Sequence, residues 1–417
     1  MRRGPSFLAF LIGAAFLLSP LRTASAAEPI RFGACDDLTK AYTFIIPQVA
    51  QAAADLADLR NMLGGIEGHP IEIILQDHGN EPQRGIECYE RLKREGVMIF
   101  EILSSPVSRA VLPRAMKDGN VLIQALVGRS DAADGKVFEW IFPIGPTYWG
   151  QAANDIKYIK DKAGGDMKGV KIAFLYLDYA FGQEPIPILQ KLQAIEGFDL
   201  KLFPYPLPGN EQSGAWTQIR RFQPDWIIHW GFSATHIVAI REMKRNGIPV
   251  DKFISVNWMN EVDINNIGPE NATGIKRGTS IVGGDDHPLK KEIIAKLYDQ
   301  GKGNGDIKLV RDSYYNVGLG VYSTMFEAAR LAIRNEGWPL TAAKIKRGLE
   351  SIREFDAGGF MAPLTITAED HGGGGKTRIE RWDGTKWVAE TDWFAAYTDV
   401  VWEIIREHSA QFAKSGQ

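Results

Sequence analysis

Two adjacent hydroxyl side chains stand where this sequence could most readily do chemistry. Ser104 and Ser105 follow an apolar run, 97–103, that predicts a buried strand, and Pro106 then begins a predicted helix. Serines here could cap the helix, supply a hydrolase nucleophile, or hold an anion at the positive end of the helix. Because proline suits the first helical position, Ser105 is the expected N-cap.

Patterns typical of catalytic sites are missing from the sequence. It contains neither G-x-S-x-G nor H-E-x-x-H. His229 and His236 fall in a predicted strand and a predicted helix, which favours core or surface roles over metal ligation. The run 372–376, "GGGGK", resembles the end of a phosphate loop, but Asp370 replaces the first glycine. We therefore expect binding without chemistry: no enzyme, no cofactor and no metal.

The elements that must position the two serines form an alternating series. Strands are predicted at 30–35, 71–77, 97–103 and from 121, and helices at about 41–62, from 81, and up to about 118. The strands are nearly continuous apolar runs, so both of their faces are expected to be covered. This pattern predicts a parallel sheet with helices on both sides.

The alternation restarts after Pro146. Strands are predicted at 171–177, 199–206, 225–231 and 252–257, with helices at about 149–162, from 181, after 213 and at 233–246. A long helix is predicted at about 313–335, and the tail reads as hairpins. The fold class is therefore α/β, with two doubly wound units in series. Ligands of such sheets bind beyond the carboxyl ends of the strands, which predicts a cleft between the units.

The N-terminus reads as a secretory signal. Arg2 and Arg3 precede an apolar segment, 7–18, and small residues predict cleavage after Ala26. No later stretch is apolar and long enough to cross a membrane, so a periplasmic protein is expected. The net charge of −3 argues against a nucleic-acid partner. Cys35 and Cys88 are either a disulfide or two separate thiols, because spacing alone does not decide.

Four segments, in order, carry a resemblance to a known family. They are "GGIEGHPIEIILQDHGNEPQRGIE", "ILSSPVSRAV", "IAFLYLDYAFGQ" and "PDWIIHWGFSATHIVAIREMKRNGI". Together they resemble the periplasmic solute-binding proteins of ABC uptake systems, in the leucine/isoleucine/valine-binding group. The similarity covers most of the chain after residue 26, and it rests on the ordered series rather than on one motif.

The resemblance implies a type I periplasmic-binding-protein fold, in which two lobes joined by three crossing strands close on a ligand. Lobe 1 would hold 27–146 and about 280–355, and lobe 2 would hold 147–279 and about 356–417. The implied partners are a small-molecule ligand and the permease and ATPase subunits of an ABC importer, with the chain itself a monomer. A ligand-sensing protein of the same fold is the alternative.

The resemblance also implies a set of ligand contacts. The loops after the third and fourth strands would hold the ligand carboxylate, and aromatic side chains would cover its body. The full set is Tyr42, Ser104, Ser105, Gly128, Arg129, Ser130, Tyr148, Trp149, Asp178, Phe181, Trp230, Phe232, Ser233, Asn257 and Trp258. Arg129 is unusual for the family; it would pair with a second ligand carboxylate or face water.

Asn257 is the most informative departure from the family. Amino-acid binders of the group usually carry an acid there, which holds the ligand ammonium, and an amide cannot supply that charge. Aromatic side chains suit flat or apolar ligands. We therefore hypothesise a carboxylate ligand without an α-amino group, such as an aromatic acid. The alternative is a branched-chain amino acid whose ammonium is held by Asp178 or another acid.

Overall fold

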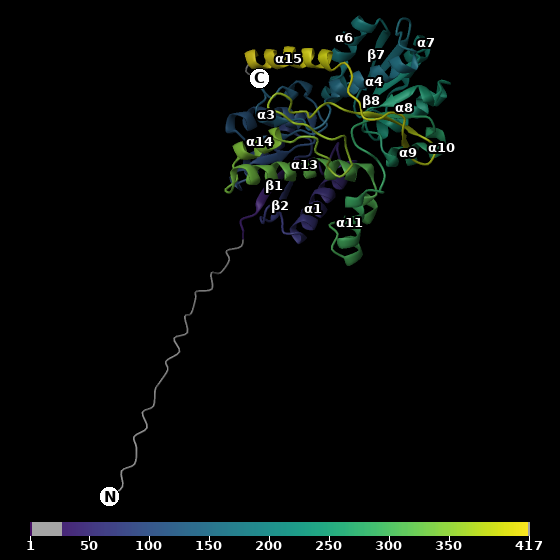
Figure 1. The fold of residues 1–417 in the computed structure, drawn as a ribbon. Helices are drawn as coiled ribbons and strands as arrows, with labels where there is room; N and C mark the ends of the chain where they lie inside the picture. The colour runs from purple at the N-terminus through teal and green to yellow at the C-terminus, as the bar shows by residue number, and fades with distance from the viewer. Residues whose placement is uncertain (2–26, 416–417) are drawn as a thin grey trace.

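The computed structural model describes residues 1 and 27–415 (Figure 1). The predicted signal segment and its cleavage after Ala26 lie outside the described residues. The described chain forms two sheets, each covered by helices, and we call each sheet with its helices a lobe.

Lobe 1 is built on a five-stranded parallel sheet of order β2-β1-β3-β4-β5. Its strands are β1 (Ile30–Asp36), β2 (Ile71–Asp77), β3 (Ile99–Glu101), β4 (Val121–Ile123) and β5 (Ile141–Phe142). Its helices are α1 (Ile46–Met62), α2 (Pro82–Arg94), α3 (Ser105–Asp118), α11 (Pro288–Lys296), α12 (Ile307–Val310), α13 (Ser313–Glu336) and α14 (Ala342–Glu350).

Successive residues of these strands point to opposite faces and enter different cores. Ile99 packs with residues of α1 and α13, whereas its neighbour Phe100 packs with residues of α2 and α3. Both faces are therefore buried, as the continuous apolar strands predict.

Lobe 2 is built on a seven-stranded sheet of order β12-β11-β10-β9-β8-β6-β7. Its parallel strands are β6 (Lys171–Leu177), β7 (Asp199–Tyr205), β8 (Trp226–Trp230), β9 (Phe253–Ser255) and β10 (Lys276–Thr279). The tail adds the antiparallel strands β11 (Arg378–Trp382) and β12 (Trp387–Ala389), which confirms the predicted hairpin. Its helices are α4 (Tyr148–Lys162), α5 (Ala180–Gln183), α6 (Ile186–Glu196), α7 (Ser213–Phe222), α8 (Ala234–Arg245), α9 (Glu261–Ile267) and α10 (Pro269–Ala272).

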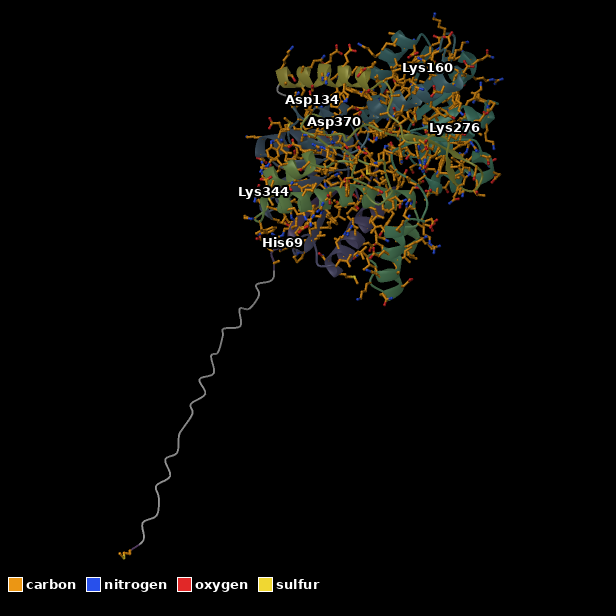
Figure 2. All side chains as sticks on the ribbon, in the orientation of Figure 1. His69, Asp134, Lys160, Lys276, Lys344 and Asp370 are labelled. Carbon is orange, nitrogen blue, oxygen red and sulfur yellow. A yellow bond between two sulfur atoms is a disulfide. The ribbon has the colours of Figure 1, made fainter. Side chains whose placement is uncertain are left out.

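The chain passes between the two sheets three times. The passages lie between β5 and α4, between β10 and α11, and between 366 and 377. Met361 forms an isolated β-bridge with Ile281 of the second passage. Within the last passage, Asp370 forms another with Asp134 of lobe 1 (Figure 2). The predicted two-lobed, doubly wound α/β architecture is confirmed.

The final helix, α15 (Thr398–Ser415), was not predicted. It packs against α4 and α6 of lobe 2 and against the 3₁₀ turn Ser130–Ala133 of lobe 1 (Figure 1, yellow). On lobe 1, Ser409 Oγ donates to Asp134 Oδ2 at 2.6 Å, and the rings of Phe412 and Phe138 lie 4.6 Å apart. The chain end is thus fastened to both lobes.

Two predicted helix starts are wrong by small amounts. Helix α3 begins at Ser105, so Ser104 is its N-cap and its Oγ accepts from Val107 N at 3.4 Å. Helix α1 begins at Ile46 rather than near residue 41. Asp37 causes this delay, because its carboxylate accepts from the amides of Lys40 and Tyr42 and holds a turn there.

Of the two readings for the cysteines, the structure contains the disulfide. It joins Cys35 in β1 to Cys88 in α2, with Cα atoms 6.1 Å apart and a separation of 53 positions in sequence. Both side chains are buried among the apolar residues that α2 and α3 share with the sheet.

Candidate functional site

A small cavity lies between the lobes. Six aromatic and two aliphatic side chains line it: Tyr42, Phe44, Ile45, Leu103, Tyr148, Phe181, Phe232 and Trp258. Its volume is about 10 Å³, which is room for about one water molecule. Phe44 of lobe 1 stacks on Phe232 of lobe 2, with ring centroids 5.1 Å apart and planes 4° apart. The lobes are therefore closed on one another.

Strand ends position this aromatic wall. Leu103 follows β3, Phe232 follows β8 and Trp258 follows β9, so both sheets direct their carboxyl ends at the cavity. This is the arrangement expected for a ligand site between open α/β sheets. The structure thus brings Tyr42, Tyr148 and four further aromatic side chains to one place.

Hydrogen bonds fix the aromatic wall on the lobe 2 side. Trp258 Nε1 donates to the Tyr148 hydroxyl at 2.8 Å, and the Tyr314 hydroxyl donates to the Trp258 carbonyl at 2.6 Å. Burial raises the pKa of the Tyr148 and Tyr314 hydroxyls well above their usual value, so both hydroxyls are neutral. On the lobe 1 side, burial likewise raises the pKa of Tyr42, whose hydroxyl faces the Ser105 amide.

The predicted carboxylate loops also meet. Ser105 Oγ accepts from Gly128 N at 3.2 Å, which joins the loop after β3 to the loop after β4. Ser104 Oγ donates to Asn80 Oδ1 at 2.7 Å, so its hydroxyl is held within lobe 1. Ser130 Oγ accepts from Trp149 N of lobe 2 at 3.4 Å.

Sequence reasoning missed Glu184, which follows α5 in lobe 2. Its Oε1 accepts from Ser130 N at 2.6 Å, and its Oε2 pairs with Arg109 of α3. The side chain is only 6% exposed. No spacing in the sequence marks it, because each of its partners lies more than fifty residues away along the chain.

Several predicted contacts do not line the cavity. Asp178 is exposed and accepts from Gln183 Nε2 at 2.7 Å. Arg129 makes two 2.7 Å bonds to Asp131, and its guanidinium lies 4.4 Å from the centre of the Phe412 ring. Arg129 is therefore held by Asp131 of lobe 1 and Phe412 of α15. Trp149 borders an outer cleft beside Glu184 instead.

Three further predicted residues lie behind or beside the cavity wall. Trp230 is fully buried, packs edge-on against Tyr148, and its Nε1 has no hydrogen-bond partner among the described residues. Asn257 is 6% exposed, and its Oδ1 likewise has no partner in the described chain. Ser233 precedes α8 with a positive φ of 49°.

A buried pair of histidines, His229 and His236, contacts the backbone of Trp258 in the aromatic wall. Tyr205 and His229 are joined at 2.8 Å, His229 Nδ1 lies 3.0 Å from His236 Nδ1, and His236 Nε2 lies 3.1 Å from the Trp258 carbonyl. Burial lowers the pKa of His236 to about 3 and that of His229 well below its usual value. Both rings are therefore neutral core residues, as the sequence favoured over metal ligation.

This pair predicts acid sensitivity that His236→Gln should reduce. A folded pKa of about 3 against 6.5 unfolded means that the stability is complete above pH 6.5 and is lost as the pH falls towards 3. From pH 7 to pH 5, His236 alone is expected to cost about 2 kcal/mol. Urea unfolding should be measured at pH 7 and at pH 5. Between these values the free energy of unfolding of the wild type should fall by about that amount more than that of the variant. A difference that does not change with pH would contradict the assignment.

Other kinds of site find no support in the described residues. Within 27–415 no cluster of three or more histidine, cysteine or acidic side chains is placed to hold a metal ion. No helix of the described chain combines the length and apolar character needed to span a bilayer.

Comparison with known proteins places the fold. The sequence profile of a family described as "Periplasmic binding protein" matches residues 29–386. A crystal structure described as an ABC transporter permease from the Pseudomonas fluorescens group is 33% identical. It has a TM-score of 0.86, with 93% of this chain and 98% of that chain covered. No curated protein sequence matches the chain.

More distant structures share the fold. A branched-chain amino acid ABC transporter protein from Thermus thermophilus with bound valine is 17% identical, with a TM-score of 0.79 and coverage of 91% of this chain and 99% of that one. A solute-binding ABC transporter protein from R. palustris in complex with benzoate is 16% identical, with a TM-score of 0.69 and coverage of 88% and 98%. With its profile match, its two lobes and its interlobe cavity, this chain belongs to the periplasmic binding protein family.

Proposed function

We propose that this chain is the extracytoplasmic substrate-binding component of an ABC importer and captures a small carboxylate-bearing solute by closing its two lobes. The observation that carries the proposal is the aromatic cavity at the meeting point of the two sheets. Its lining contains no charged side chain, so the body of the solute is apolar or aromatic.

The polar groups near the cavity favour an acid. The loops after β3 and β4 present backbone amides and hydroxyls, and the N-terminus of α3 adds its positive dipole end. Asn257 supplies no charge for an ammonium, and Asp178 lies outside the cavity. An unpaired ammonium in this buried site would lose its hydration without compensation. We therefore favour an aromatic or other acid without an α-amino group over a branched-chain amino acid.

Entry of the solute requires the lobes to separate. The closed cavity accepts about one water molecule, far less than any organic acid needs. The sheets of the two lobes are linked by three chain passages, which suits hinge opening. The proposed cycle is opening, capture, closure and delivery to a membrane permease, with no chemical change of the solute.

Calorimetric titration tests the ligand class. We expect benzoate to bind and leucine to bind weakly or not at all, because the aromatic wall suits a flat ring and offers no countercharge to an ammonium.

Phe232→Ala should lose most benzoate affinity, since it removes the ring stacked on Phe44. Phe222→Ala is the matched control, because Phe222 packs on Phe203 in the other core of lobe 2. Tight leucine binding would contradict the proposed class, and unchanged uptake of every acid after gene disruption would contradict transport.

A further inference from the structure

The carboxylate of Glu184 occupies the place that the resemblance assigns to the ligand carboxylate. Ser130 lies on one of the loops expected to hold the ligand carboxylate, and its N donates to Glu184 Oε1 at 2.6 Å, while Arg109 pairs with Oε2. Two donors of lobe 1 thus hold one carboxylate of lobe 2.

The seat is shaped for that carboxylate. A Cβ atom at Gly128 would lie 2.9 Å from both Cδ and Oε2 of Glu184, so a larger residue would displace the group. Gly128 N donates to Ser105 Oγ, so the Glu184 carboxylate lies where the loop after β4 meets the loop of the two predicted serines. The positive charge of Arg109, the amide of Ser130 and the space beside Gly128 all suit a carboxylate at this position.

A neighbouring contact also joins the lobes, because Trp149 N of lobe 2 donates to Ser130 Oγ of lobe 1 at 3.4 Å. Within lobe 2, Trp149 Nε1 donates to the Glu184 carbonyl at 2.7 Å. The side chains facing Glu184 from the outer cleft are Arg109, Arg129, Asp131, Gln183 and His408, of which Arg129 is neutralised by Asp131. Arg109 is therefore the cation that Glu184 satisfies.

We propose that Glu184 is an internal pseudo-ligand that determines specificity: it holds the lobes together by filling the carboxylate seat, and only a solute with its own carboxylate displaces it. This inference deepens the proposed function and rests on it. A neutral solute that opens the lobes breaks the Glu184 contacts and leaves Arg109 and the Ser130 amide unpaired. An acid replaces them, so one carboxylate exchanges for another at little net cost.

Glu184→Gln tests the proposal by scattering and calorimetry. X-ray scattering of the free protein should show a larger radius of gyration than the wild type, because the charged contact between lobes is lost. Benzoate should bind about tenfold tighter or more, since its competitor is gone. Benzamide, the neutral analogue, should bind neither protein well. Glu196→Gln is the matched control, because Glu196 pairs with Lys160 at 2.7 Å entirely within lobe 2, and it should change neither quantity.

Arg109→Met gives an independent test. It should also open the free protein, but without tightening benzoate, because the cation that receives the solute is removed. Unchanged scattering and affinity for Glu184→Gln, or weaker benzoate binding, would overturn the proposal. If no variant binds benzoate, the proposed ligand class fails, while the scattering still decides whether Glu184 closes the lobes.

Discussion

Replacing Glu380 by glutamine is expected to lower the free energy of unfolding by about 3–5 kcal/mol. Glu380 on β11 stands directly opposite Arg277 on β10, and the two side chains are 1% and 2% exposed. Arg277 reaches Glu380 Oε2 through Nη2 at 2.7 Å and Nε at 2.9 Å, and it donates to the Met259 carbonyl at 2.7 Å. Glutamine would leave this guanidinium charged and buried without its countercharge.

The pKa of Glu380 supports that reading. Burial alone would raise it, but the charges of Arg277 and Arg378 outweigh burial and hold the pKa below its usual range. A lowered folded pKa means that this stabilisation is present above about pH 4.5 and is lost as the pH falls.

Denaturant unfolding at pH 7 measures the effect. Glu336→Gln is the control, because Glu336 pairs with Arg347 at the surface and is expected to matter little. The double variant Arg277→Met with Glu380→Leu should recover part of the loss, since it removes both buried charges. A loss for Glu380→Gln no larger than that of the surface control would contradict the assignment.

Removing the disulfide should have a comparable effect. Replacing Cys35 and Cys88 together by alanine is expected to cost about 4 kcal/mol, because the bridge closes a loop of 53 residues in the unfolded chain. Removal of the two buried sulfur atoms also leaves small cavities in the core that α2 shares with the sheet. The expected result is a lower urea midpoint.

Reductant separates the two contributions. Dithiothreitol should lower the wild-type midpoint towards that of the double variant and leave the variant unchanged. A wild-type midpoint that ignores the reductant after full reduction of the bridge would show that the covalent link stabilises little.

The strands were the most predictable part of the fold. Runs 71–77 and 171–177 match β2 and β6 to the residue. For β6 the reason is its burial, because a strand buried on both faces needs continuous apolar sequence. Local polar contacts moved the helix starts. The Asp37 carboxylate that delays α1 is ordinary in sequence, and its effect becomes visible only when its amide partners are known.

Helix α15 shows a different limit. Its buried residues Val401, Ile404, Ile405 and Phe412 recur at helical spacing, so an amphipathic helix was readable there. The preceding hairpin signals led the whole tail to be read as hairpins. What the sequence could not supply is the surface that the helix covers, because that surface exists only once both lobes are assembled.

The site divides in the same way. The loops at Ser105 and Gly128 meet because parallel strands direct their carboxyl ends to one edge, a rule that sequence reasoning can apply. Glu184 and Arg109 meet only because one lobe closes on the other. Contacts that form only when two lobes close on one another produce no repeating pattern in the sequence. The role of Glu184 could therefore not be predicted.

Helix α15 and the segment that precedes it also limit how far the two lobes can separate. Its bonds to lobe 1 are buried, through Ser409 and Phe412, whereas its ion pair with lobe 2 joins the half-exposed Lys191 and Glu403. The helix also buries Val401, Ile404 and Ile405 and packs against α4 and α6 of lobe 2, so opening must separate it from one lobe or the other. While it stays on lobe 1, the segment 390–397 joins it to lobe 2, and fully extended this segment would span roughly 26 Å. The reach of this segment sets an upper limit on how far lobe 2 can swing while the chain end stays docked.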